Sequence, residues 1–283
     1  MKQTGVVIIA FSFCIALSLF IGSFLLLNVK AIPEHIHMMD TARDALESLL
    51  EMQLGEQNYL THHQKEALDD VKDKMADLRK LHASLEESKI AEKRAEFFEL
   101  ADWEKAMNLY ERLFDQFVMY HEAVEKNIAA IRDLEKSILA VIYSKMNPER
   151  GIIGLQEIRI HEKGYLLYRN YPEPLEERSF PEMRKEAVSN FLMWSQKDKR
   201  IEELMEKDDQ LFNEIMNNYE SQDHTLLALE GESGKIRNIC EKFLEEGEKR
   251  LHITYRRCML LSITLLIMWL CMAIAIVSTM FRS

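Results

Sequence analysis

Residues 103–131 read WEKAMNLYERLFDQFVMYHEAVEKNIAAI, and this stretch decides the fold. Its large apolar and ring-bearing residues recur in alternating steps of four and three, at Trp103, Met107, Tyr110, Phe114, Phe117, His121, Val124, Ile128 and Ile131. This spacing puts them on one face of a helix and is typical of antiparallel bundles and coiled coils. We interpret the aromatic residues as core rather than as a cofactor site.

The seam belongs to a long helix that we predict over residues 92–146, because Asn147 and Pro148 stop a helix. The rest of the central region is rich in Leu, Met, Glu, Lys and Gln, which favour helices, and the whole chain has only 9 Gly and 5 Pro. The fold class is therefore all-α. The other predicted helices span residues 33–63, 65–88, 150–169, 181–200, and 203 onward into the C-terminal apolar segment.

Helix lengths suggest how these elements are arranged. At 1.5 Å per residue the helix over 92–146 is about 80 Å long, roughly the sum of those over 33–63 and 150–169, at about 45 Å and about 30 Å. We therefore expect two stacked antiparallel four-helix bundles, with the long helix passing through both. The expected modules are a membrane-near one of about residues 33–120 plus 232–257 and a far one of about residues 121–231.

An uncharged apolar segment lies at each end of the chain. Residues 5–28 read GVVIIAFSFCIALSLFIGSFLLLN, and residues 258–280 read CMLLSITLLIMWLCMAIAIVSTM. Each is long enough to cross a bilayer as a helix, which takes about 20 residues. The sequence therefore predicts two transmembrane helices around a domain of residues 31–257. The N-terminal signal-anchor pattern favours placing that domain outside the cytoplasm.

The central domain is acidic. All 47 Asp and Glu residues lie within residues 34–257, together with 33 of the 36 Lys and Arg residues, so this interval carries a net charge of −14. Such a surface repels nucleic acid, and we exclude DNA or RNA as a partner. Any anionic ligand must find a local basic pocket.

Motifs of catalysis and of metal binding are absent from the sequence. It contains no phosphate-binding loop, nucleophile elbow or paired-cysteine motif. Two histidine pairs, at residues 35 and 37 and at residues 62 and 63, have no nearby cysteine and no clear third ligand. We therefore predict no enzyme activity, no metal site and no cofactor.

The motif E-x-x-Y-L occurs twice, at residues 56–60 and 162–166. Along the same heptad each helix begins apolar and becomes polar at the same depth. An arginine paired only with Glu162 could bind a carboxylate ligand bidentately, whereas the alternative is an ordinary ion pair between Arg159 and Glu162. The candidate ligand-binding residues are these polar positions: Gln53, Glu56, Arg159, Glu162 and Arg169.

Two apolar ends around six helices in two levels, with this motif in each level, resemble the helical bimodular sensor domain. That family provides the extracytoplasmic ligand-binding regions of bacterial chemoreceptors and sensor kinases. Residues 162–167, EKGYLL, are also similar to the "ERGYLL" stretch of related single-bundle sensor domains. The resemblance implies that a dimer recognises small molecules, often organic acids, inside its bundles.

The leading hypothesis is a sensor-type protein of the bacterial inner membrane, with a periplasmic or extracellular domain and a role in signal transduction such as chemotaxis. The sequence ends at Ser283, soon after the second apolar segment, so we expect no cytoplasmic output domain. Its signal would then pass through helix contacts to a membrane partner. The alternative is a structural or assembly protein whose bundle is a spacer or a partner surface.

Small residues recur every fourth position in the first apolar segment, at Ala10, Cys14, Ser18 and Gly22. Such a face lets two membrane helices approach closely. We predict a homodimer through this helix, and the alternative is that the face packs on the second apolar segment of the same chain.

Overall fold

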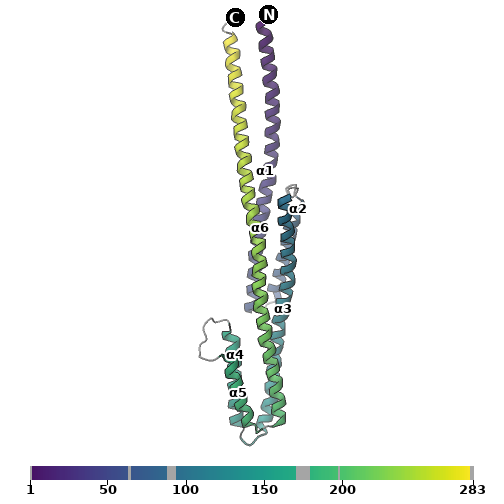
Figure 1. Ribbon diagram of the computed structural model, residues 1–283, viewed down its shortest axis with the longest axis vertical. Helices are drawn as coiled ribbons and strands as arrows, with labels where there is room; N and C mark the ends of the chain where they lie inside the picture. Colours follow the sequence, from purple (N-terminus) through teal and green to yellow (C-terminus); the bar gives the residue numbers. More distant parts are fainter. Residues whose placement is uncertain (1, 63–64, 88–93, 170–178, 197, 281–283) are drawn as a thin grey trace. The chain divides into compact units, whose positions relative to one another are not determined.

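The computed structural model describes residues 2–62, 65–87, 94–169, 179–196 and 198–280 (Figure 1). Every regular element in these residues is an α-helix, which confirms the predicted all-α fold class. The helices are α1 (Lys2–His62), α2 (Lys65–Glu87), α3 (Arg94–Tyr143), α4 (Pro148–Tyr168), α5 (Phe180–Trp194) and α6 (Lys199–Met280).

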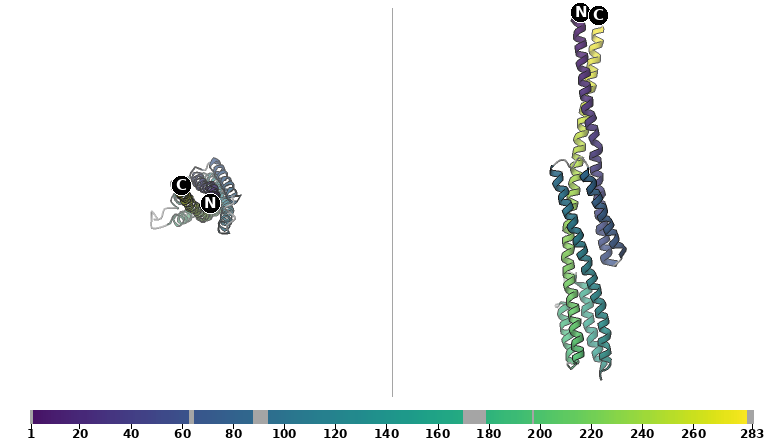
Figure 2. Two further views of the ribbon diagram at one scale, coloured as in Figure 1. Left: turned by 90° about the horizontal axis from the view of Figure 1, so that it is seen from above. Right: turned by 90° about the vertical axis from the view of Figure 1, so that its right-hand side faces the viewer.

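The chain divides into two compact units. Unit 1 is Met1–Glu111 with Glu230–Ser283, and unit 2 is Arg112–Leu229. Unit 1 therefore contains α1, α2, the first part of α3 and the second part of α6, whereas unit 2 contains the remainder of α3 and α6 together with α4 and α5. Within the units, α1 packs along α2 and α4 packs along α5 (Figure 2). The stacking of two four-helix bundles stays a prediction.

The seam of α3 is buried as its spacing predicts. Eight of its nine residues are buried and Ile128 is half-buried. In unit 2 all four helical segments share one core, to which α3 contributes Ile142, α4 Leu155, α5 Phe191 and α6 Ile201. Apolar residues at helical spacing are therefore what holds unit 2 together.

The helix α1 differs from the expectation of a separate membrane segment at 5–28 and a domain helix that begins at residue 33. It is one helix from Lys2 to His62, with Pro33 inside it. Proline lacks an N–H, so one backbone hydrogen bond is missing there. The turns on both sides nevertheless stay helical, and the N-terminal apolar segment continues directly into the domain.

The connection between α5 and α6 was predicted wrongly, with α5 ending at residue 200 and α6 beginning at residue 203. In the structure α5 ends at Trp194 and α6 begins at Lys199. The reason is an N-cap: Oδ1 of Asp198 accepts hydrogen bonds from the backbone N–H groups of Arg200 (2.9 Å) and Ile201 (3.3 Å). The other helix ends in the central domain differ from the prediction by a turn or less.

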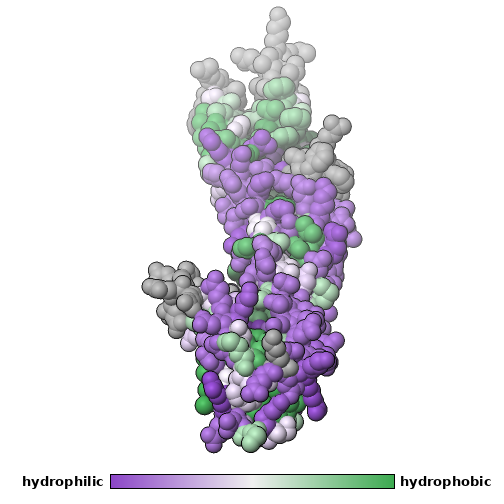
Figure 3. All heavy atoms as spheres, turned by 60° about the horizontal axis from the view of Figure 1, so that its bottom comes forward, coloured by the Kyte–Doolittle hydropathy of each residue, from purple (hydrophilic) through white to green (hydrophobic). Residues whose placement is uncertain are grey.

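Both terminal helices are long and apolar enough to cross a membrane, by length and composition. Their most apolar windows have mean hydropathies of 2.1 in α1 and 2.5 in α6. The side chains there are uncovered, with Phe20 and Leu266 each 70% exposed. Figure 3 shows these hydrophobic side chains on the terminal helices, while the visible face of the rest is mostly hydrophilic. The apolar parts of α1 and α6 lie beside one another in unit 1 (Figures 1 and 2).

Candidate functional site

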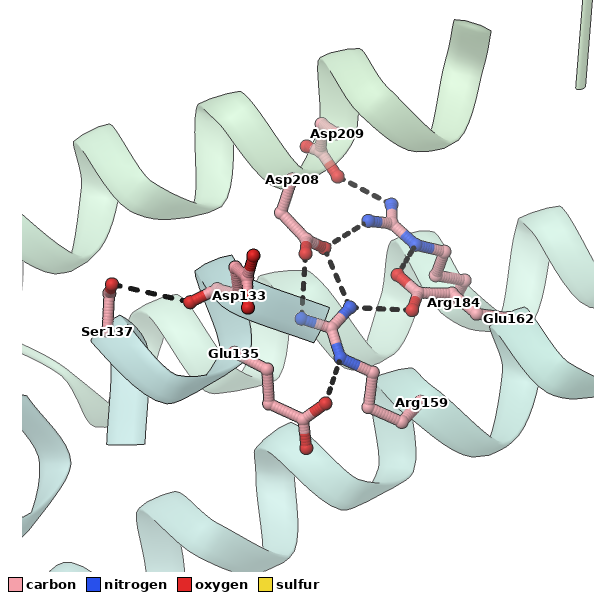
Figure 4. A network of polar contacts seen from close by, with 8 residues as sticks. All are labelled: Asp133, Glu135, Ser137, Arg159, Glu162, Arg184, Asp208 and Asp209. Carbon is pink, nitrogen blue, oxygen red and sulfur yellow. Dashed lines mark hydrogen bonds and ion pairs between the residues drawn. The ribbon is translucent and has the colours of Figure 1, made fainter. Parts of the chain in front are cut away.

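Unit 2 contains a buried network of charged side chains, shown in Figure 4. Its centre consists of two arginines and two carboxylates, and one further carboxylate lies on each side. The residues are Glu135 of α3, Arg159 and Glu162 of α4, Arg184 of α5, and Asp208 and Asp209 of α6. All four helical segments of unit 2 therefore meet in this network.

The two residues from α4 form the pair that the sequence suggested. Arg159 is 8% exposed and Glu162 is 4% exposed. Because they are three residues apart, they lie on one helix face, and Nη1 of Arg159 donates to Oε2 of Glu162 at 2.6 Å. The same guanidinium also binds Asp208 with two hydrogen bonds, from Nη2 at 2.7 Å and from Nη1 at 3.2 Å. The bidentate partner of Arg159 is thus a side chain of α6.

Arg184 closes the network from α5. Its Nε donates to Oε1 of Glu162 at 2.7 Å, and its Nη2 donates to Oδ2 of Asp208 at 2.7 Å. A third bond runs from Nη1 to Asp209 at 2.5 Å. The guanidinium also lies over the ring of Phe212, 4.5 Å from its centroid. Each central carboxylate is therefore held by both arginines.

Burial and pairing oppose one another in the pKa values of this network. Burial and the charge of Asp208 raise the pKa of Glu162, while Arg159 and Arg184 act against the rise. Burial alone would lower the pKa of Arg159, but its bond to Asp208 and the charge of Glu162 outweigh that effect and raise it. The pKa of Arg184 is raised for the same reason, mainly through Glu162. Both arginines therefore stay charged.

This arrangement has a limited chemical repertoire. Both Nη atoms of Arg159 are already bound to Asp208 and Glu162, so an organic acid that bound Arg159 bidentately would have to displace one of these carboxylates. The network also contains more carboxylates than arginines, which opposes an added anion. Removing one member would leave buried charge uncompensated. The geometry therefore favours holding four helices in register.

Arg169, the second arginine among the predicted site residues, also belongs to unit 2 but lies apart from the network. It binds both oxygens of Asp223, at 3.2 and 3.1 Å. Its guanidinium carbon lies 3.6 Å from the ring centroid of Tyr219. The same side chain borders a surface groove of about 580 Å³. Arg169 thus forms an ion pair with Asp223 near the surface and stacks on Tyr219.

Gln53 and Glu56 lie in unit 1, so the predicted site residues are distributed over both units. Nε2 of Gln53 donates to Oγ of Ser233 at 3.0 Å, and Nη2 of Arg237 donates to Oε1 of Gln53 at 3.1 Å. Glu56 is 8% exposed, and its Oε1 has no hydrogen-bond partner among the described residues. Burial, with the nearby charge of Glu230, raises the pKa of Glu56 to about 8.

Sequence reasoning missed Glu135, Arg184, Asp208 and Asp209. A signal for Asp208 was present, since α6 has its own seam of steps of four and three. That seam consists of Ile201, Met205, Asp208, Phe212 and Ile215. A carboxylate at a core position needs a buried cationic partner, and this rule would have predicted one.

No group of three or more His, Cys, Asp or Glu residues suited to a metal ion occurs in the part of the chain that the structure describes. His37 contacts Oγ of Ser84 through Nε2, at 3.2 Å. The side chains of the pair at residues 62 and 63 lie outside the described ones.

We compared the chain with protein-family models, with curated proteins and with solved structures. None of the three comparisons found a match. The function therefore has to be argued from the physical features of this chain.

Proposed function

We propose that this chain is a membrane-anchored sensor whose helical domain passes a conformational signal to the membrane through α1 and α6. The observation that supports this proposal is the continuity of both helices. α1 runs unbroken through Lys2–His62 and α6 through Lys199–Met280. Each joins a segment apolar enough for a bilayer to a face buried in the domain.

Helix length makes this coupling effective. With 61 residues in α1 and 82 in α6, the two helices are about 90 Å and about 120 Å long. Shifts of about 1–2 Å between packed helices are typical of signalling transitions. A ligand that binds one packing of α1 and α6 better than another would shift the population toward it, and the difference would reach the membrane segments.

The proposal includes a bacterial inner-membrane location, a periplasmic domain and two stacked four-helix bundles. It also includes a homodimer through the first membrane segment. Two observations support that contact: Cys14 and Ser18 are only partly covered, and a Cβ at Gly22 would meet no atom within 4 Å. Small residues with open space beside them leave room for a second helix.

A small organic acid or another small molecule is the proposed ligand. Binding at Arg159 requires an exchange in which the ligand carboxylate replaces Asp208 or Glu162. Such an exchange would release α6 or loosen α4, so binding there would itself be a conformational signal. A buried carboxylate without a cationic partner is unfavourable, so the displaced side chain must then reach water or take up a proton.

A second candidate function is a rigid spacer or assembly protein. The observation that favours it is the mutual pairing in the Arg159 network, where side chains of the chain itself occupy the bidentate position. A spacer needs fixed helices and no ligand. The two functions therefore differ in whether any small molecule alters the α1–α6 contact.

Two native cysteines provide the test. Cys14 and Cys271 occupy matching depths if residues 5 and 280 mark the same membrane face. With Cys240 and Cys258 replaced by serine, the full chain in lipid bilayers is exposed to organic acids and amino acids, and the rate of Cys14–Cys271 cross-linking is measured with the unfolding midpoint. A compound that raises the midpoint and changes the rate supports the sensor. A panel that changes neither supports the spacer.

A further inference from the structure

Glu56 is a buried carboxyl group, and no cationic side chain among the described residues pairs with it. On α1 it shares a helix face with Met52, one turn before it, and with Tyr59, one turn after it, and these residues are 1% and 6% exposed. Its own side chain is 8% exposed, and its Oε1 takes part in no hydrogen bond with the described residues. A charged carboxylate in such a place is strongly disfavoured, so the group binds a proton instead.

No ion pair joins Glu56 to a cation of a neighbouring helix within the part of the chain that the structure describes. On α6 the nearby charge is that of Glu230, another carboxylate. On α2 the residues beside Gly55 are Ala67 and Val71, which are apolar. Four basic groups on these helices have other partners: Arg237 binds Gln53, Lys235 binds Glu232, Lys74 binds Glu51 and Arg79 binds Glu111.

The position of Glu56 connects it to the membrane helices. Gln53, one turn earlier on α1, is bonded to Ser233 of α6, and Oγ of Ser233 donates to the backbone oxygen of Glu230 at 3.0 Å. In an antiparallel helix pair, Glu56 therefore lies opposite the turn of α6 that contains Glu230. A charge at Glu56 would act directly on the contact between the two helices that enter the apolar segments.

We propose that Glu56 is a proton-binding site whose occupancy controls the contact between α1 and α6. With the proton bound, the side chain is neutral and stays buried. When the proton leaves, the carboxylate faces Glu230 in a dry position, and the strain is relieved by admitting water or by separating α1 from α6. The ligand of this site is the proton itself, and its transmission to the membrane rests on the sensor function proposed above.

The expected pH dependence of stability follows from whether Glu56 binds its proton more tightly in the folded or in the unfolded chain. The ordinary pKa is 4.5, and burial raises the pKa of Glu56 to about 8 in the folded chain. Between these values the folded chain binds more protons than the unfolded chain, so stability falls as pH rises. The contribution is complete below pH 4.5 and is lost by the time the pH has passed about 8.

The first measurement is the unfolding midpoint of the full chain in lipid nanodiscs, from about pH 5 to about pH 9. Glu56→Gln resembles the protonated side chain in shape and charge, so it should fold and should flatten the decline in the midpoint. Glu47→Gln, an exposed carboxylate on the same helix, should leave the decline as in the wild type. A Glu56→Gln profile that follows the wild-type profile overturns the proton site.

Infrared difference spectroscopy gives a second readout that does not depend on stability. The carbonyl band of protonated carboxyl groups should be present at neutral pH in the wild type and in Glu47→Gln, and weaker in Glu56→Gln. If Glu56→Gln has the same carbonyl band as the wild type, the proton site is contradicted even if the unfolding midpoints agree with it.

Transmission is tested separately by the rate of Cys14–Cys271 cross-linking at the two ends of this pH range. A rate that depends on pH in the wild type and not in Glu56→Gln supports control of the α1–α6 contact. If the midpoints and the infrared band identify the proton site but the rate ignores pH, the site stands and its coupling to the membrane is overturned.

Discussion

Glu56 and Glu162 occupy the same position of the repeated E-x-x-Y-L motif, one in each unit, and both are buried. Their surroundings are opposite. Glu162 accepts hydrogen bonds from Arg159 at 2.6 Å and from Arg184 at 2.7 Å. Oε1 of Glu56 has no partner in the described residues, and the nearby charge is Glu230. Equal burial therefore produces a fixed ion pair in unit 2 and a titratable group in unit 1.

A glycine adds to this difference. The motif has Gly164 in unit 2 and the exposed Asn58 in unit 1. A Cβ at Gly164 would overlap the ring of Phe180 at the start of α5. Close approach of α5 to α4 allows Arg184 of α5 to reach Glu162. The comparison teaches that the partner helix, more than the motif, decides what a buried glutamate does.

The largest expected effect is in unit 2. Glu162→Leu removes one of the two carboxylates that Arg159 and Arg184 share, and breaking a buried pair costs about 3–5 kcal/mol of unfolding free energy. Denaturant unfolding of the full chain in detergent measures it. The control Glu157→Leu, exposed on the same helix, should change stability by about 0.5 kcal/mol or less. Equal losses in the two variants would show that the network adds nothing.

The same substitution in unit 1 should have the opposite sign. Glu56→Leu removes a buried group without a partner, and such groups cost about 1–3 kcal/mol. Above pH 8, where the native carboxyl is charged, the variant should be more stable than the wild type by about this amount. Denaturant unfolding at high and low pH measures the gain, which should shrink in acid. If Glu56→Leu is less stable than the wild type at both pH values, then Glu56 stabilises the fold as Glu162 does.

Glycines test how tightly each unit is packed. A Cβ at Gly151 in unit 2 would overlap the Trp194 ring, so Gly151→Ala should destabilise by about 1–3 kcal/mol. A Cβ at Gly231 in unit 1 would meet no atom within 4 Å, so Gly231→Ala should stabilise α6 by about 1 kcal/mol. Thermal unfolding of both variants checks the signs. Destabilisation by Gly231→Ala would reveal a contact or a bend at that point.

The smallest effect is expected at Arg169. Lysine keeps the charge but loses the Nη1 contact with both oxygens of Asp223 and the planar stack on Tyr219. Because the pair is at the surface, Arg169→Lys should cost about 0.5–1 kcal/mol. Unfolding at low and high salt measures the loss. A loss as large as that of Glu162→Leu would make Arg169 part of the structural centre of unit 2.

Much of the fold could be predicted from helical spacing. The seam of α3 is buried as expected, and Pro148 begins α4 close to the predicted start. The start of α6 was missed because Asp198 acts through a local cap, which apolar spacing does not reveal. Unbroken helix through Pro33 was missed as well, because one lost hydrogen bond is tolerated when both adjoining turns stay helical.

The candidate site was only half predictable. The pair of Arg159 and Glu162 follows from their separation along one helix. Their contacts with Arg184 and Asp208 join residues 22 to 49 positions apart, and only the packing of α5 and α6 brings them together. No local pattern contains such a distance.

By itself the sequence determined the helical class, the two apolar ends and the acidic surface, since each depends on composition or on a period within one element. Only the tertiary structure decided whether each of the two motif glutamates has a cationic partner. The free energy of a buried carboxyl depends on the charges within a few ångströms, and those charges come from other helices. The arginines of α4 and α5 keep Glu162 paired, whereas burial and the carboxylate of α6 raise the pKa of Glu56.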